Sequence, residues 1–455
     1  MNQTTITFWG GLRTIGGNIA EIKYGNDRVI FDFGLVYDPS TTIIQTKQRA
    51  SKYVSDQLQL NAIPMIDGIY QQEDIQAGVY AFEPLKAFEE TELNTAVFIS
   101  HLHLDHIGAM DTIAPQIPVY LSKESKAYFH QLEKIGEGLT KQRDYTGINY
   151  QEPLHIGAIK VTPFQTDHDA YGSMAMLVET PDLTVLYSGD IRMHGQHPEY
   201  NQTLIKAMQD YTIDLLLLEG TSFRPHTEEE STADQTRVQS EKEIASFIAE
   251  KLNAHDRLAV FNIYHRNLDR IEHMIDVGNR TKRTVVFELA TAHLADRFAS
   301  DKQFAILVPS RETLTVWEQD LMDRYPIVNA TQINKAPATY FVQNSFDRIT
   351  DLLDLEVQGA LYFHSNGIPL GAFDLNYHAL LGLLEQLGLI YQSVNVSGHA
   401  TQSDILALID AIQPRLLVPW HSHYPELVIP NNPEQAVFLP AKATYVYNDG
   451  TLNKI

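Results

Sequence analysis

The sequence contains no cysteine among its 455 residues. This absence excludes disulfides, thiol nucleophiles and thiolate metal sites, so any metal ion must be held by histidine, carboxylate, carbonyl or water ligands. No apolar run approaches the ~18 residues that a membrane span requires. The first residues show neither the basic nor the apolar region of a signal peptide. We therefore expect a cytoplasmic protein with no membrane contact.

Basic residues are also scarce. The 34 Lys and Arg residues are outnumbered by 57 Asp and Glu residues, which gives a formal net charge of −23. Nucleic-acid binding over a wide surface relies on Lys and Arg that neutralise phosphates, and this composition argues against it. Any function on nucleic acid must therefore use a local site. The hydrophobic content of 44% is typical of a globular protein, and the length suits two domains.

The pattern of strands and helices changes twice along the sequence. In the middle of the chain, apolar strand-like segments precede helical ones, as in LAVFNI, TVVFEL and GALYFHS. This alternation predicts a parallel, doubly wound α/β unit. The residues before and after it are rich in short strands. We therefore predict one discontinuous domain, 1–225 and 390–455, with an α/β domain inserted at 226–389.

The segment VFISHLHLDHIGAMD places four ionisable side chains after an apolar strand: His101, His103, Asp105 and His106. Burying these groups is costly unless something compensates them. Two adjacent metal ions would do so, because imidazole and carboxylate are the ligands that zinc takes where cysteine is absent. A helix cap made by Asp105 is the alternative. That alternative leaves the three histidines unexplained.

The same arrangement recurs downstream. His168 follows the strand in VTPFQTDH, Asp190 follows the one in VLYSGD, and His421 follows the one in LLVPWH. Strand ends are where a rigid scaffold presents functional side chains. A single histidine at a strand end is more often structural, but seven such positions together predict a metal site.

This ordered set resembles the ligands of the metallo-β-lactamase fold, as do FDFG with Asp32 and the opening WGGLRTIGGN. The resemblance implies an α/β protein, an αββα sandwich with the α/β domain inserted. It also implies that Asp190 bridges two metal ions. The first ion would take His101, His103 and His168, and the second would take Asp105, His106 and His421.

The long stretch between Asp190 and His421 resembles the β-CASP branch of this fold, which processes nucleic acids. Glu219 in LLLLEGTS, His399 in NVSGHATQ and His421 in VPWHSHYPE match the three motifs of that branch. The nearest likeness is to ribonuclease J. The sequence departs from ribonuclease J at Asn395, where histidine is common, and at Ser422, where glycine is usual. We also expect no separate domain after His421, so the resemblance does not imply recognition of the 5′ end.

Two short segments have the composition of phosphate-binding turns. Ser397 and Gly398 let backbone N–H groups approach an anion, and Ser365 with Asn366 in FHSNGIP offers a second such turn. The alternative for both is an ordinary turn. His399 paired with Glu219 would form an acid/base pair; otherwise it is a core histidine.

The function predicted is hydrolysis of phosphodiesters in single-stranded nucleic acid, by exo- or endonucleolytic cleavage. Two divalent ions roughly 3.5–4 Å apart would hold a bridging hydroxide. Asp105 and Asp190 would orient this hydroxide, and His399 would protonate the leaving oxygen. Histidine-rich ligation favours Zn²⁺ and leaves Mn²⁺ open. The resemblance implies single-stranded RNA as the substrate, with DNA still open, and a homodimer.

Two other classes of function compete. The same metal core would suit hydrolysis of a small ester, lactone or phosphodiester, which the net charge of −23 favours. A non-catalytic binding subunit is the third reading. It is disfavoured because such proteins typically lose metal ligands, and all seven are present here.

Overall fold

The computed structural model describes residues 3–35, 49–78, 82, 84–225, 238–309, 313–448 and 450–455. The chain divides into two compact units. The first comprises Met1–Met193, His197–His226 and Gly398–Ile455, and the second comprises His194–Gln196 and Thr227–Ser397. None of the helices in the described residues is long and apolar enough to cross a membrane.

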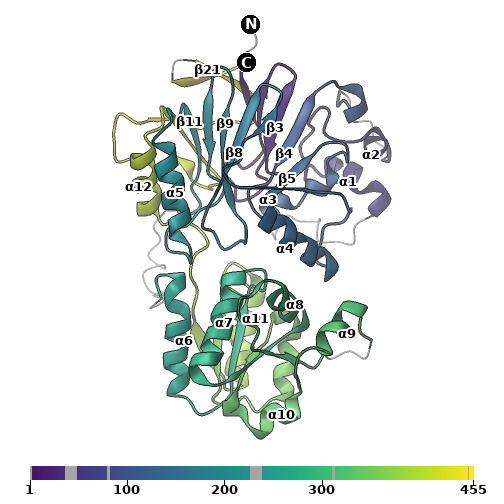
Figure 1. Cartoon of the computed structure of the whole chain (residues 1–455), viewed down its shortest axis with the longest axis vertical. Helices are drawn as coiled ribbons and strands as arrows, with labels where there is room; N and C mark the ends of the chain where they lie inside the picture. Colours follow the sequence, from purple (N-terminus) through teal and green to yellow (C-terminus); the bar gives the residue numbers. More distant parts are fainter. Residues whose placement is uncertain are drawn as a thin grey trace. The chain divides into compact units, whose positions relative to one another are not determined.

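Two mixed sheets form the centre of the first unit (Figure 1). One has the order β22-β21-β1-β2-β3-β4-β5-β6 and the other the order β20-β19-β11-β10-β9-β8-β7. Strands of the first sheet are β1 Thr5–Phe8, β2 Ala20–Tyr24, β3 Asp27–Phe31, β4 Asn94–Phe98, β5 Val119–Ser122, β6 Thr146–Ile148, β21 Thr444–Asn448 and β22 Thr451–Lys454. Strands of the second are β7 Leu154–Ile156, β8 Ile159–Gln165, β9 Met174–Glu179, β10 Thr184–Tyr187, β11 Leu215–Glu219, β19 Leu416–Trp420 and β20 Ala436–Val437.

The hydrophobic core of this unit lies between the two sheets. Phe8 and Phe31 of one sheet and Val178 and Leu217 of the other belong to a single buried cluster. Apolar side chains alternate along these strands, so each strand faces the core on one side. A second buried cluster joins the outer face of the second sheet to two helices, α5 and α12. The layers are those of an αββα sandwich, and the predicted fold class is confirmed.

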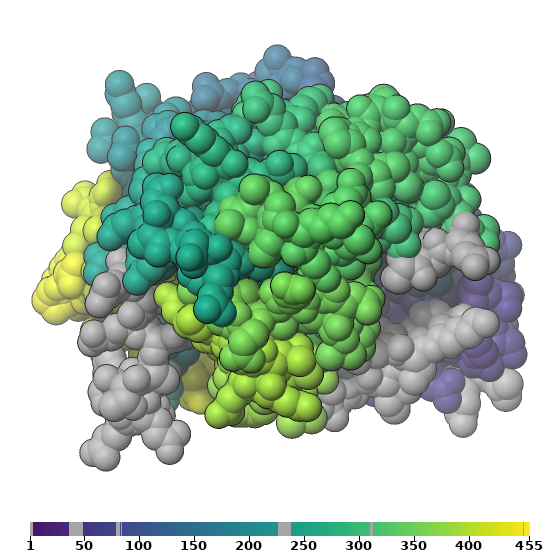
Figure 2. All heavy atoms as spheres, turned by 90° about the horizontal axis from the view of Figure 1, so that it is seen from below, coloured from purple at the N-terminus to yellow at the C-terminus, as the bar shows by residue number. Residues whose placement is uncertain are grey.

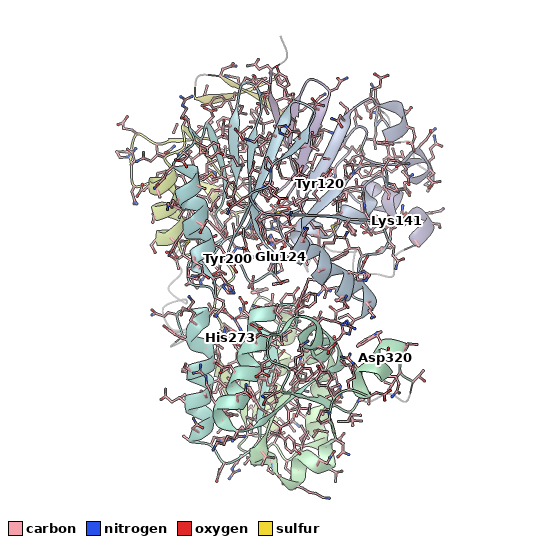
Figure 3. The ribbon with its side chains drawn as sticks, in the orientation of Figure 1. Tyr120, Glu124, Lys141, Tyr200, His273 and Asp320 are labelled. Atoms are coloured by element: carbon pink, nitrogen blue, oxygen red, sulfur yellow. The ribbon has the colours of Figure 1, made fainter. Side chains whose placement is uncertain are left out.

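The helices of the first unit lie on either side of the sheets (Figure 1). On one side are α5 Pro198–Met208 and α12 Gln402–Ile412; on the other are α1 Tyr53–Gln59, α2 Gln72–Gln76, α3 Leu104–Ile107 and α4 Lys123–Lys134. Lys141, which is labelled in Figure 3, forms an ion pair with Asp74 on α2, with Nζ 2.8 Å from Oδ1. Single turns of 3-10 helix are η2 Ala50–Lys52, η3 Phe88–Glu90, η4 Met110–Thr112 and η9 Pro425–Leu427.

The second unit is built on a parallel sheet with the order β15-β14-β13-β16-β12-β17-β18. Its strands are β12 Ala259–Ile263, β13 Thr284–Phe287, β14 Ala305–Leu307, β15 Ile327–Val328, β16 Tyr340–Gln343, β17 Leu361–Ser365 and β18 Ile390–Ser393. Its helices are η6 Glu241–Glu243, α6 Ile244–Asn253, α7 Leu268–Thr281, α8 Leu289–Phe298, α9 Val316–Met322, α10 Ala330–Lys335, η7 Pro337–Thr339, η8 Phe346–Asp354 and α11 Leu375–Gln386. Its described residues gather into one continuous mass (Figure 2).

Of the two sequence-based boundaries of the second unit, 226 and 389, only the later one falls on described residues. Residues 226–237, where the chain enters the unit, lie outside the described residues. At the other end the unit continues through Ser397, because β18 pairs in parallel with β17. β18 is an edge strand with partly exposed side chains, so its sequence, IYQS, lacks the apolar run of the inner strands.

Candidate metal centre

All seven predicted metal ligands belong to the first unit. Four of them follow β4: His101 and His103 lie in the loop that leads into α3, and Asp105 and His106 lie in α3 itself. His168 follows β8, Asp190 follows β10, and His421 follows β19. The N-cap of α3 is His103, and Asp105 lies in the first turn. Asp105 therefore does not cap this helix, and its carboxylate contacts His106 and His421 instead.

Three histidines form the first cluster. One ligand nitrogen each from His101, His103 and His168 lies within 4.8 Å of the others. His168 Nε2 is 3.1 Å from His103 Nδ1. The rings of His101 and His103 meet edge to face, with centroids 4.8 Å apart. Three imidazoles at this spacing fit three positions of a tetrahedral metal site.

The second cluster comprises Asp105, His106, Asp190 and His421, again with ligand atoms within 4.8 Å of one another. His106 Nε2 is 3.2 Å from Asp190 Oδ2, and His421 Nε2 is 3.0 Å from Asp105 Oδ2. Asp190 Oδ2 also lies 3.6 Å from His101 Nε2. Asp190 therefore adjoins both clusters.

Burial makes these contacts costly without a cation. His101 is fully buried, and Asp190 is 2% exposed. Neither His101 Nε2 nor either oxygen of Asp190 has a hydrogen-bond partner of normal geometry in the described residues. Buried polar atoms are normally paired. A set of imidazole and carboxylate donors with orphaned atoms fits divalent metal ions.

Asp32 fixes the orientation of His106 from behind. Its Oδ2 accepts a hydrogen bond from His106 Nδ1 at 2.7 Å. The same carboxylate accepts from the backbone N–H of Ser100 at 2.7 Å and from the hydroxyl of Tyr187. The proton on His106 Nδ1 leaves the Nε2 lone pair facing the carboxylates of the second cluster. A carboxylate behind a metal-ligating imidazole both orients it and raises its basicity.

Two other histidines are held in the same way. His168 Nδ1 donates to the carbonyl of Gly398 at 2.5 Å. His421 Nδ1 donates to the hydroxyl of Thr221 at 2.7 Å, and this hydroxyl donates in turn to the His421 carbonyl. In both rings the Nε2 lone pair therefore points into the site. His421 Nε2 lies 3.0 Å from Asp105 Oδ2, so a proton or a metal ion between these two atoms is attracted to both.

The backbone is unusual at the same places. Asp32 and His421 adopt left-handed conformations, with φ of 59° and 48°. Non-glycine residues rarely do so, and such conformations gather at functional sites. Gly34 packs so closely that a Cβ there would lie 1.6 Å from the carbonyl oxygen of Asp105. Only glycine at position 34 lets the loop that carries Asp105 approach β3.

The pKa shifts mostly favour the protonation states that bind a cation. Burial lowers the pKa of His101, aided by the neighbouring His106, and it lowers the pKa of His168 to about 4. Burial opposes ionisation of Asp190, yet His421 and His106 hold its pKa well below the usual range. His106 differs. Burial would lower its pKa, but Asp190 and Asp105 raise it well above the usual range, so a cation must displace a proton there.

Glu219 and His399 form the predicted pair. Glu219 is 3% exposed, and its Oε2 lies 3.0 Å from His399 Nδ1. Its Oε1 accepts from the backbone N–H of Ile191 at 3.0 Å. Burial would lower the pKa of His399, but Glu219 raises it. The ring of His399 stacks on that of His421, with centroids 5.6 Å apart, so the pair adjoins the second cluster.

The predicted phosphate-binding residues have partners within their own units. In the second unit, Ser365 is fully buried, and its hydroxyl accepts from Arg270 at 2.6 Å and donates to the Val394 carbonyl at 2.9 Å. Asn366 Oδ1 accepts from the backbone N–H of Val396 at 2.9 Å. These side chains therefore shape the turn itself.

Ser397 and Gly398 mark the point where the chain passes from the second unit to the first. The Ser397 carbonyl accepts from His194 Nε2 at 3.2 Å, within the second unit. The Gly398 carbonyl is the acceptor for His168. Both carbonyls thus have partners.

Three residues beside the site escaped the sequence-based reasoning: Asp169, Thr221 and the Asp32 carboxylate as a partner of His106. Asp169 directly follows His168 in TDHDA. An acidic residue next to a predicted ligand could have been recognised as a further candidate for the site. Nothing in the sequence links Thr221 to His421, which lie far apart along the chain.

A comparison with protein families matches residues 61–261 to the "Beta-lactamase superfamily domain". Ribonuclease J of Pyrococcus abyssi is 22% identical, and the alignment covers 100% of this chain and 98% of that protein. Ribonuclease J of Mycolicibacterium smegmatis is 24% identical over 73% of this chain and 59% of that protein. Among solved structures, a protein of unknown function from Enterococcus faecalis superposes with a TM-score of 0.80 at 27% identity, covering 98% of this chain and 100% of that one.

Proposed function

Because the chain is a ribonuclease J-like protein with the metallo-β-lactamase fold, we propose that it is a metal-dependent nuclease that hydrolyses single-stranded RNA. The observation that carries this proposal is the pair of adjoining clusters, with Asp190 in the second cluster and 3.6 Å from His101 of the first. Within them, His101 Nε2 and both oxygens of Asp190 are buried and lack a hydrogen-bond partner in the described residues. The likeness to ribonuclease J over the whole chain supports RNA as the substrate.

Each of the two metal ions would have its own set of ligands. His101, His103 and His168 would hold one ion, Asp105, His106 and His421 the other, and Asp190 both. Divalent ions at such a site supply Lewis acidity: they lower the pKa of water and offset the charge of a phosphate. Five imidazoles favour Zn²⁺, and the carboxylates keep Mn²⁺ as the alternative.

His399 is the proton donor in this proposal. Glu219 holds a proton on the imidazole through the 3.0 Å contact with Nδ1, and the far nitrogen of the ring then protonates the leaving oxygen. Asp105 accepts no proton here, because the neighbouring His106 and His421 hold its pKa well below the usual range against the effect of burial. Its role is to orient the attacking water.

A time course on 3′-end-labelled single-stranded RNA tests the proposal. The RNA carries either a 5′-monophosphate or a 5′-hydroxyl, with Zn²⁺ or Mn²⁺ added. We expect mononucleotide release or internal cuts by the parent protein, and none by His103→Ala prepared in parallel. Equal cleavage by the two preparations would reveal a contaminating nuclease.

Hydrolysis of a small ester, lactone or phosphodiester is the second candidate, favoured by the net charge of −23. Nitrophenyl esters, a lactone and bis(nitrophenyl) phosphate are therefore assayed beside the RNA. A protein that carries two metal ions, leaves RNA intact and cleaves one of these compounds contradicts the nuclease proposal. Cleavage of the RNA and of none of these small compounds excludes this alternative.

A further inference from the structure

We infer that Asp169 is a further carboxylate ligand of the metal ion held by His101, His103 and His168. The inference rests on the metal centre of the proposed function and adds an eighth donor to it. Asp169 follows β8 in the loop that also carries His168, so both side chains start from the same strand end. Asp169 is not among the seven metal ligands predicted from the sequence.

One carboxylate oxygen of Asp169 is buried beside the first cluster. Its side chain is 17% exposed, yet Oδ1 is fully buried and has no hydrogen-bond partner in the described residues. Gly398 packs against it: a Cβ at position 398 would lie 2.4 Å from this oxygen. A buried carboxylate oxygen without a partner is costly, so some ligand must compensate it.

Of the two histidine nitrogens near this oxygen, the closer is Nε2 of His168, and it is itself a hydrogen-bond acceptor. Asp169 Oδ1 lies 3.3 Å from His168 Nε2. Because a carbonyl can only accept, His168 Nδ1 carries the proton that Gly398 receives, and in the neutral imidazole Nε2 is then an acceptor. Two acceptors therefore face each other across 3.3 Å. Neighbouring ligands of a metal ion at about 2.1 Å are roughly this far apart. A cation between them turns the repulsion into attraction.

An indirect role through His103 fits less well. Asp169 Oδ1 is 3.7 Å from His103 Nε2, which is longer than a hydrogen bond. His103 Nδ1, by contrast, is 3.1 Å from His168 Nε2, the spacing of two ligands of one ion. The carboxylate thus stands closer to the ligand nitrogen of His168 than to a donor on His103.

An eighth donor changes the metal preference of the centre. With Asp169 the first site has two carboxylates, as the second site has in Asp105 and Asp190. Carboxylate oxygens are hard donors and favour Mn²⁺ relative to a site of imidazoles alone. Removing Asp169 should therefore weaken Mn²⁺ more than Zn²⁺.

Asp169→Cys offers a direct test, because the natural chain has no cysteine and the new thiol is its only one. The variant is loaded with Co²⁺ and its near-ultraviolet spectrum is recorded. We expect a thiolate-to-cobalt charge-transfer band. Asp144→Cys, at an exposed position of the same unit, is the control and should show none. The band requires direct coordination, which a merely structural role would not produce.

Asp169→Asn supplies the second readout. We expect the dissociation constant of one of the two Mn²⁺ ions to rise at least tenfold, with a smaller rise for Zn²⁺ and no change at the other site. Asp144→Asn makes the same change of charge away from the centre and should leave both constants unchanged. Far-ultraviolet circular dichroism confirms that each variant is folded.

The outcomes separate the inference from the proposed function. If the parent protein binds no divalent ion, the metal centre fails and the inference fails with it. If the parent binds two ions, Asp169→Cys gives no band and Asp169→Asn binds as the parent does, only the inference is overturned. Weaker binding by Asp169→Asn without a band in Asp169→Cys assigns Asp169 to the orientation of His103 and overturns the role of ligand.

Discussion

Asp32 is a buried residue whose single carboxylate ties together β3, the loop after β4 and β10. We expect Asp32→Asn to weaken divalent metal binding by about 10- to 100-fold. The amide turns an N–H toward the N–H of His106, so the imidazole loses its acceptor and its orientation. The backbone change is small, because asparagine tolerates the left-handed conformation at this position. Competition with a chelator measures the affinity.

Tyr187→Phe is the matched control for this variant. It removes one hydrogen bond to the same carboxylate but leaves the contact with His106 intact. Metal affinity should stay within a few-fold of the parent. Equal losses in the two variants would show that the carboxylate acts through packing around β10 and not through the imidazole.

Because Asp111 is buried, we expect its carboxyl group to make the free energy of unfolding depend on pH. Burial raises its pKa to about 6, although the backbone N–H of Lys141 donates to Oδ2. The folded state therefore holds this proton more tightly than the unfolded state, where the pKa is about 3.9. The free energy of unfolding falls as the pH rises through this window. Asp111→Asn should be more stable than the parent at pH 8, on the order of 2 kcal/mol.

Chemical unfolding at several pH values measures this difference. The difference should vanish below about pH 3, where position 111 is neutral in the folded and unfolded states of both proteins. Because the metal ligands are the same in both proteins, their titration cancels in the comparison. A stability difference that does not change with pH would mean that the amide acts through its new hydrogen bonds.

At this scale the strand-end positions of histidine and aspartate were sufficient to locate the residues that cluster. The partners behind them were not predictable. Thr221 reaches His421 because β11 and β19 are neighbours in the sheet, and Gly398 reaches His168 although the two residues lie 230 positions apart in the sequence. Such partners depend on tertiary packing, which leaves no spacing in the sequence.

At the scale of elements, alternating strands and helices predicted the parallel sheet of the second unit, and the mixed sheets followed from the resemblance. The position of β18 was not foreseen. Its residues, IYQS, are half-exposed at the sheet edge, so they lack the apolar signal that marks β12 and β17. Edge strands carry the weakest hydrophobic pattern.

Arg270 on α7 joins three elements of the second unit. Its guanidinium binds both oxygens of Glu241 in η6, at 2.9 and 3.1 Å, and reaches Ser365 at the end of β17. His273, labelled in Figure 3, lies 3.4 Å from the same glutamate. Arg270→Met should destabilise the unit by about 3–5 kcal/mol, because Glu241 is left buried and uncompensated. Denaturant unfolding measures the loss.

Arg280→Met is the control on the same helix. Arg280 pairs with Asp276 at 2.8 Å, but both side chains are nearly half exposed, so this change should cost less than about 1 kcal/mol. If the two variants lose the same stability, the buried pair does not hold the three elements together.

For the whole molecule, divalent ions should stabilise one unit and not the other. All the proposed ligands lie in the first unit, so each ion at 100 times its dissociation constant should add about 2.7 kcal/mol to the free energy of unfolding of that unit. Chelation should lower its unfolding temperature and leave the transition of the second unit in place. Calorimetry with and without chelator measures both. His103→Ala combined with His421→Ala should abolish the response, and a shift in both transitions would contradict the assignment. The homodimer stays a prediction.

The first unit is closed by strands from the end of the sequence. β19 completes the sheet beside β11, and β21 pairs with β1. During translation the N-terminal part of the chain emerges from the ribosome first, so β1 and β11 emerge long before these partners. The second unit is made of nearly continuous sequence and is complete earlier. The unit synthesised later can therefore fold first, while the earlier one waits with unpaired strand edges, which are prone to aggregation. His421 joins the metal centre only after the whole second unit has been synthesised.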